Sequence, residues 1–199
     1  MRIVALIVLF LGSAAGSATP PPTPLRAPSN AGDLNEVMRL LAMRQHGRVE
    51  FVEQHFLSVL KRPVESSGEL RYDAPDRLEK RTLQPRAETL LLAGGVLTVE
   101  RGHSRRVLDL HAYPQVQPFV ESIRATLAGD RVALERLFDV EFAGGVNHWA
   151  LFLVPLQASV KQSVSEVRID GARDQLLRVE IRQPDGDRSL LTLRPAAQP

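Results

Sequence analysis

The residues of this chain that could do chemistry are few, and they form no known catalytic signature. Histidines stand at positions 46, 55, 103, 111 and 148, without the HExxH spacing that puts two zinc ligands on one helix face. No GxSxG turn is present to expose a serine nucleophile. A zinc site or a serine triad assembled from distant residues stays open, but the sequence predicts no enzyme, no metal and no cofactor.

A pair of aspartates near the C-terminus resembles part of a calcium-binding loop. Asp185-Gly186-Asp187 lacks the further spaced acids that an EF-hand loop needs. Following Pro184, it is typical of a tight hairpin turn instead. We therefore interpret it as a turn between the last two strands.

Charge and aromatic content argue against a nucleic-acid partner. The net charge is only +2, and the basic residues are interleaved with acidic ones rather than gathered in a patch. Aromatic residues make up 5%, too few for a platform on which bases could stack. Cysteine is absent, which excludes a disulfide framework and a lipid-anchored lipoprotein.

The chemistry that the chain does offer is apolar and arranged with a period of two. Turn signals such as Ser66-Ser67-Gly68 and Gly94-Gly95 recur roughly every 8 to 12 residues, which is typical of an antiparallel meander. The predicted strands cover residues 48–60, 69–73, 78–83, 89–92, 96–100 and 106–110.

Helical spacing flanks this meander. Asp33, with Glu36 three residues on, predicts the N-cap of a first helix that Gly47 ends. A second amphipathic helix is predicted over residues 117–127, and Asp130 is expected to cap a third one that carries Phe138.

Strands return after the break at Gly144-Gly145. They are predicted around Trp149 to Leu153 and over residues 163–169, 175–183 and 189–193. No alternation of strand and helix occurs, so a parallel sheet is not expected. The predicted fold is α+β, with a single curved antiparallel sheet that forms a half-open, incomplete β-barrel covered on its concave face by helices.

The N-terminus has the pattern of an export signal. Arg2 precedes an apolar run that is too short to span a bilayer, and small residues lead to a cleavage site after Ala18. We expect a signal peptide over residues 1–18, a Pro-rich tether over 19–32, and one domain over 33–194. This predicts a soluble protein of the bacterial periplasm.

Several segments, in this order, resemble the LolA-type superfamily of periplasmic lipoprotein carriers, and its LolA-like branch more than the founding carriers. They include Val49-Glu50-Phe51-Val52-Glu53, Leu60-Lys61-Arg62-Pro63, Gly68-Glu69-Leu70-Arg71-Tyr72, Leu127-Ala128-Gly129-Asp130 and Trp149-Ala150-Leu151. The resemblance implies a half-open barrel that binds acyl chains. Founding carriers have a basic residue that holds the lid closed where this chain has Ala74, and either Arg71 or Arg77 could replace it.

A ligand cavity is predicted on the apolar face of the sheet and of the second helix. For any single residue the alternative is ordinary core packing. Burial of an acyl chain would contribute about 0.8 kcal/mol per CH₂, without any special polar chemistry. The predicted lining residues are Phe56, Leu70, Tyr72, Leu78, Leu90, Leu92, Leu97, Leu108, Leu110, Phe119, Ile123, Leu127, Trp149, Leu151 and Leu153.

The sequence thus predicts a monomeric carrier of a lipid or a lipidated protein client. An inner-membrane exporter would load it, and an outer-membrane acceptor would take the client. Movement of the helices over residues 33–46 and 117–138 is expected to gate both steps. A lipid-sensing regulatory module on the same fold remains an alternative hypothesis.

Overall fold

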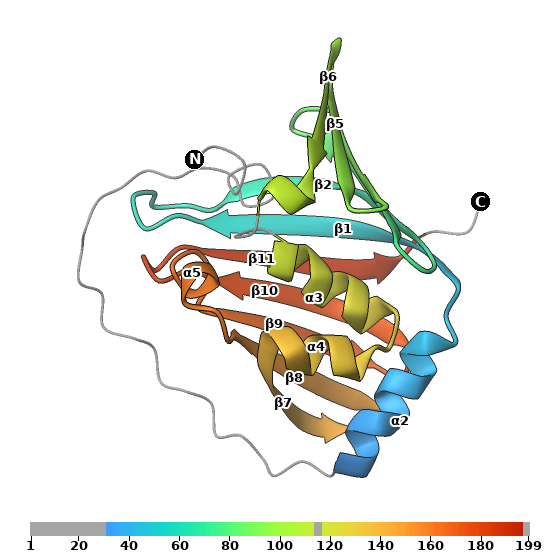
Figure 1. The fold of residues 1–199 in the computed structure, drawn as a ribbon. Coiled ribbons are helices and arrows are strands. Elements are labelled where there is room, and N and C mark those ends of the chain that lie inside the picture. Colours follow the sequence, from blue (N-terminus) through green and yellow to red (C-terminus); the bar gives the residue numbers. More distant parts are fainter. Residues whose placement is uncertain (1–30, 114–116, 197–199) are drawn as a thin grey trace.

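Strand β1 (His46–Phe56) lies in the middle of the sheet around which the whole chain is arranged (Figure 1). The structure is a computed structural model that describes residues 31–113 and 117–196. The predicted signal peptide and nearly all of the predicted tether lie outside these residues. Within them, 11 strands form one antiparallel sheet in the order β6-β5-β4-β3-β2-β1-β11-β10-β9-β8-β7. The predicted fold class, an open curved antiparallel sheet with helices, is confirmed.

The first half of the sheet grows outward from β1 as a meander. Val49 of β1 pairs with Leu70 of β2, and each following strand adds to the outer edge. All six predicted strands are present, with boundaries that differ by a few residues. After β1, their bounds are β2 (Val64–Asp73), β3 (Arg77–Gln84), β4 (Glu88–Ala93), β5 (Val96–Arg101) and β6 (Ser104–Asp109).

The second half starts at the opposite edge and returns to β1. The chain crosses the sheet through helices and re-enters it at β7, and β11 finally pairs with β1, where Phe51 lies opposite Leu193. Both edges of β1 are therefore occupied. The elements are η1 (Leu110–Ala112), α3 (Gln117–Leu127), α4 (Arg131–Leu137), β7 (Phe138–Gly145), β8 (His148–Pro155), α5 (Ala158–Lys161), β9 (Glu166–Ala172), β10 (Gln175–Arg182) and β11 (Arg188–Pro195).

One tight turn joins α3 to α4. Gly129 has a φ of +65°, the Gly129 N–H donates to the Thr126 carbonyl, and the Asp130 N–H donates to the Ala125 carbonyl. This pair of hydrogen bonds is the Schellman motif, which commonly ends helices at a glycine. The Asp130 carboxylate then accepts from the Ala133 N–H and caps α4. The predicted bounds of α3 and the predicted cap of α4 are both confirmed.

Three predicted helix boundaries were wrong. Helix α2 (Ala31–Ala42) starts before Asp33, which lies in its first turn, and it ends well before Gly47. Gly47 belongs to β1, where it pairs with Tyr72. Phe138 is not helical but is the first residue of β7. This strand was not predicted because it runs through Gly144. Only glycine tolerates the φ of +90° and the close approach to the His148 carbonyl at that position.

Buried side chains form two separate clusters on the concave face. The larger cluster joins α2, α3, α4 and strands β7 to β10, and includes Leu34, Leu134 and Ile169. The smaller one contains Leu92, Leu97, Val99 and Leu110, from β4, β5 and η1. Between the two lie the central strands and α3, so the packing of the sheet is interrupted there.

None of the helices in the described residues is long and apolar enough to cross a membrane.

Gly129 gives a direct test of this arrangement. A Cβ at this position would lie 2.1 Å from the Met38 carbonyl oxygen of α2, in addition to the strain of the positive φ. Gly129→Ala is therefore expected to lower the free energy of unfolding by about 2–4 kcal/mol in denaturant titrations. The matched control is Gly102→Ala, because Gly102 has a φ of +57° and nothing within 4 Å of the added Cβ. Equal losses for the two variants would contradict the close packing of α2 on this turn.

Candidate functional site

A cavity of about 300 Å³ lies between the concave face of the sheet and helix α3. Its wall combines strands β1 to β5 with β10 and β11, and α3 closes it with Val120, Ile123 and Leu127. Protein interiors rarely leave voids larger than a water molecule, whereas ligand sites start at about 300 Å³. The cavity therefore has the size of a ligand site rather than of a packing defect.

The structure brings eight of the predicted lining residues together around this cavity. They come from strands on the β6 side of β1 and from α3, and period-two alternation places the strand residues on one face. These residues are Leu70, Tyr72, Leu78, Leu90, Leu92, Leu97, Ile123 and Leu127. That they contact a ligand stays a prediction.

Six of the other predicted lining residues lie elsewhere. Trp149, Leu151 and Leu153 are buried in the larger cluster, and Leu110 is buried in the smaller one, with Leu108 packed against it. Phe56 points to the opposite face of β1, where the Arg188 guanidinium lies 3.8 Å from its ring centroid. The side chain of Phe119 lies outside the described part of the chain.

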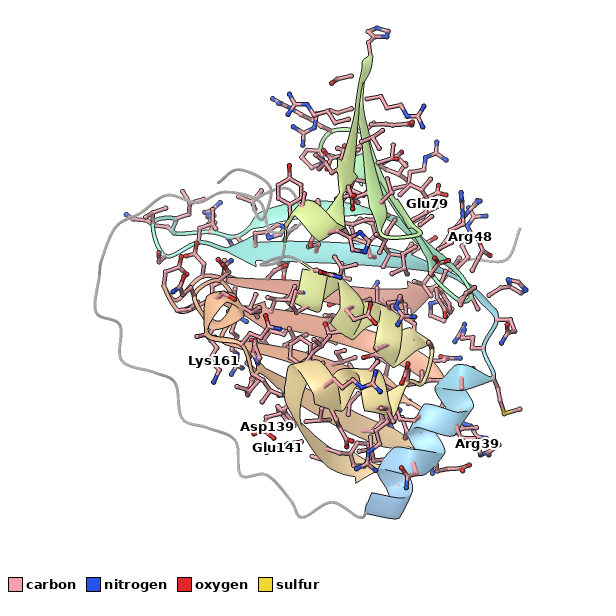
Figure 2. The ribbon with its side chains drawn as sticks, viewed as in Figure 1. Arg39, Arg48, Glu79, Asp139, Glu141 and Lys161 are labelled. Carbon is pink, nitrogen blue, oxygen red and sulfur yellow. The ribbon has the colours of Figure 1, made fainter. Side chains whose placement is uncertain are left out.

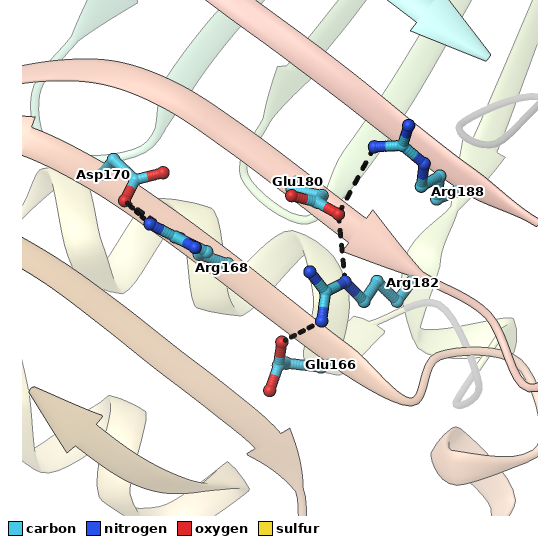
Figure 3. A network of polar contacts seen from close by, with 6 residues as sticks. All are labelled: Glu166, Arg168, Asp170, Glu180, Arg182 and Arg188. Atoms are coloured by element: carbon cyan, nitrogen blue, oxygen red, sulfur yellow. Dashed lines mark hydrogen bonds and ion pairs between the residues drawn. The ribbon is translucent and has the colours of Figure 1, made fainter. Parts of the chain in front are cut away.

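The convex face of the sheet is polar at the same strands. Arg168 bonds to Asp170 on β9, while Arg182 on β10 bonds to Glu180 and Glu166 (Figure 3). These side chains alternate along β9 and β10 with the buried Val167, Ile169, Val179 and Ile181. The sheet is thus apolar on the cavity side and carries ion pairs on the outer side.

A polar cluster interrupts the apolar wall at the middle of the sheet. Glu53 of β1 lines the cavity and is only 7% exposed. Its carboxylate is paired with the Lys80 ammonium and accepts hydrogen bonds from Ser66 at 3.2 Å and Ser189 at 3.4 Å. His55 Nε2 lies 3.3 Å from the same carboxylate. Every oxygen of this buried group therefore has partners, as a buried charge requires.

The charge state of Glu53 follows from these partners. Burial raises the pKa of Glu53, but the hydrogen bond from His55 and the charge of Lys80 outweigh burial and lower that pKa to about 2. Glu53 is therefore ionised at neutral pH.

This polar cluster was not among the predicted sites. Val49, Phe51, Glu53 and His55 alternate on one strand, so the same period of two that puts Phe51 inside also puts Glu53 and His55 inside. Two ionisable residues continuing a buried face were the signal that could have identified it.

Charged residues surround one end of the cavity. Arg44, Arg48 and Arg71 line it together with Glu79 and Asp174, and Figure 2 shows Arg48 and Glu79 near one another at the same end of the sheet. Arg44 pairs with Asp174, and Arg48 donates to Glu69 at 2.7 Å.

The two arginines near Ala74 are placed differently. Arg71 lines the cavity, whereas Arg77 lies near the carboxylates of Asp73 and Glu79. Arg71 is exposed and alternates with Leu70 and Tyr72 on β2, so its side chain points to the opposite face from these two cavity residues.

Helix α3 has two distinct faces. Ser122, Ala125 and Thr126 are fully buried on one face, while Val120, Ile123 and Leu127 line the cavity. Val120 packs against both hydrophobic clusters. In contrast, the apolar face of α2 is buried in the larger cluster, and no α2 or α4 residue lines the cavity in the described part of the chain. Of the predicted gating helices, only α3 contacts the cavity.

The described residues contain no group of three histidine, cysteine, aspartate or glutamate side chains that could hold a metal ion.

The profile of a known protein family matches almost the whole domain. That family is described as "Outer membrane lipoprotein carrier protein LolA-like", and the match covers residues 26–198. The chain belongs to this family. No curated protein matches the sequence of this LolA-like chain.

Solved structures that match the LolA-like chain share little sequence with it. A LolA superfamily protein from Nitrosomonas europaea is 10% identical with a TM-score of 0.41, over 84% of this chain and 95% of that one. The complex of MucA and MucB from Pseudomonas aeruginosa is 14% identical with a TM-score of 0.46, over 84% of this chain and 58% of that one. The lipoprotein LppX of Mycobacterium tuberculosis is 12% identical with a TM-score of 0.43, over 83% of this chain and 95% of that one.

The lowered pKa of Glu53 predicts a specific loss of stability in acid. Since the pKa is lower in the folded state, the stabilisation is fully present above about pH 4.5 and is lost as the pH falls toward about 2. The loss should be on the order of 3 kcal/mol in the free energy of unfolding, measured by denaturant titration at several pH values.

Variants assign this acid sensitivity to one residue. Glu53→Gln is expected to flatten the pH dependence in this range, whereas Glu36→Gln, at an exposed carboxylate paired with Arg39, should leave it nearly unchanged. An undiminished acid dependence in Glu53→Gln would refute the assignment.

Proposed function

We propose that this LolA-like protein is a periplasmic carrier that holds the acyl part of a lipid or a lipidated protein client in the cavity under α3. The observation that supports this most strongly is the unfilled apolar volume between the two hydrophobic clusters. The family match points the same way, because it is to lipoprotein carriers.

The lining provides enough binding energy without covalent chemistry. Each CH₂ transferred from water contributes about 0.8 kcal/mol, so ten of them contribute about 8 kcal/mol before the ordering costs of the chain. Uptake is therefore favourable, and release is the step that needs help. We propose that an inner-membrane exporter loads the carrier and that an outer-membrane acceptor with a higher affinity removes the client.

Helix α3 is the proposed gate. Among the described side chains of α3, three line the cavity, and the far end of the helix is tied to α4 by the turn at Gly129. Displacement of α3 would open the cavity while α2 and α4 stay in the larger cluster. Arg44 and Asp174, which are paired at one end of the cavity, would lie near the polar part of a bound client.

Filling the cavity should weaken ligand binding. In the double variant Leu90→Trp/Ile123→Trp, indole rings enter from the sheet and from α3, and the affinity for a fluorescent fatty acid is expected to fall at least about tenfold. The matched control is Leu83→Trp/Val132→Trp, at positions 45% and 58% exposed and outside the cavity lining. Circular dichroism confirms the fold of both variants. Unchanged affinity in the first variant would contradict the proposal.

Locking α3 to the sheet tests the gate separately. The chain has no cysteine, so a cysteine pair placed across the contact between Val120 and the smaller cluster creates the only disulfide. The oxidised protein is expected to take up the fluorescent fatty acid much more slowly than the reduced protein. Equal uptake rates in the two redox states would show that α3 does not gate the cavity.

A further inference from the structure

Lys80 and Glu53 place a charged pair inside a cavity that is otherwise mainly apolar at its centre. Lys80 lies on β3 and Glu53 on β1, so the Lys80 side chain reaches across β2 to its partner. It passes over the Phe51 ring, with Nζ 5.0 Å from the centroid. The residue of β2 opposite Phe51 is Gly68, where a Cβ would lie 2.0 Å from the Arg81 carbonyl oxygen. Gly68 therefore lets the backbone of β3 approach β2 closely next to the position where Lys80 crosses.

The two residues of this ion pair differ in how many hydrogen-bond partners they have. The Glu53 carboxylate has four polar partners, which are Lys80, His55, Ser66 and Ser189. The Lys80 ammonium carries three N–H donors, and Glu53 is its one hydrogen-bond acceptor among the described residues. The Lys80 side chain is 22% exposed and lines the cavity. A ligand in the cavity can thus accept a hydrogen bond from Lys80, while Glu53 has little capacity left.

Electrostatics decides which acceptor fits. Ionised Glu53 balances the charge of Lys80, so a free carboxylate or phosphate brought to Lys80 would also meet the negative charge of Glu53. A neutral carbonyl oxygen avoids this repulsion and still accepts a charge-assisted hydrogen bond.

We propose that Lys80, held in place by Glu53, donates a hydrogen bond to the ester or amide carbonyl that links an acyl chain to the rest of the ligand. This inference rests on the proposed function, because it places the acyl chain in the cavity under α3. It adds a specificity site: the pair recognises acyl linkages and discriminates against pure hydrocarbons and free fatty acid anions.

Competition binding with three probes tests this site. Methyl palmitate, octadecane and palmitate each compete for the cavity with the neutral fluorophore N-phenylnaphthylamine. The wild-type protein is expected to bind the ester about tenfold more tightly than the hydrocarbon, and also more tightly than the anion. Palmitate binding as tightly as the ester would overturn the proposal in favour of an anion site.

A charge-free variant shows whether the pair causes the preference. Glu53→Gln/Lys80→Met removes both charges of the ion pair together, and it should lose the tenfold preference for the ester over the hydrocarbon. The matched control is Lys161→Met on α5, an exposed lysine outside the cavity lining, far from Arg48 in Figure 2. Retention of the ester preference in the double variant would overturn the inference.

A measurement on the wild-type protein does not depend on how the variants fold. With isotopically labelled lysine, the Lys80 ammonium resonance should shift on addition of methyl palmitate and stay in place with octadecane. Absence of that difference overturns the proposal for Lys80 alone. If the wild-type protein binds neither ester nor hydrocarbon, the cavity is no lipid site, and the proposed function fails together with this inference.

Discussion

Val120 of α3 packs against both hydrophobic clusters of this protein, but the space between them beneath α3 is unfilled, and this space shapes the rest of the structure. The larger cluster is complete by itself, since α2, α4 and one face of α3 fill the hollow of strands β7 to β10. The smaller cluster fixes the outer strands of the meander. The strip of sheet between them is covered by the second face of α3, and side chains do not fill the space beneath it. Close packing on both sides is what keeps this volume open.

The same strip explains why charges are buried at the centre of the sheet. Apolar side chains at Glu53 and Lys80 would extend the two clusters toward one another and remove the space. An ion pair with serine and histidine partners instead makes the sheet side of the cavity polar at one point. A buried pair of this kind adds little net stability compared with apolar packing, so its presence fits a role in recognition better than a role in folding.

The sequence was sufficient for the sheet and for part of the site. Period-two alternation and turn residues identified the meander, and Gly129 and Asp130 marked the turn between α3 and α4, because these signals are local. Strand β7 was missed since Gly144 looked like a break, although its neighbours on β8 make it part of the sheet. Trp149, Leu151 and Leu153 have the same alternation as the cavity residues, and only their packing against α2 and α4 places them in the core. The local sequence pattern is the same for a sheet face that packs in the core and for one that borders a cavity.

The central proposal for this protein is that the space under α3 is a site for acyl chains. The most direct measurement is native mass spectrometry, with lipid extraction, of the protein purified from the periplasm of its own host. We expect a co-purifying ligand that carries an acyl chain, at close to one molecule per protein. A protein that is recovered empty, and that also takes up no added fatty ester, would contradict it and would show that the gap between the clusters holds only water.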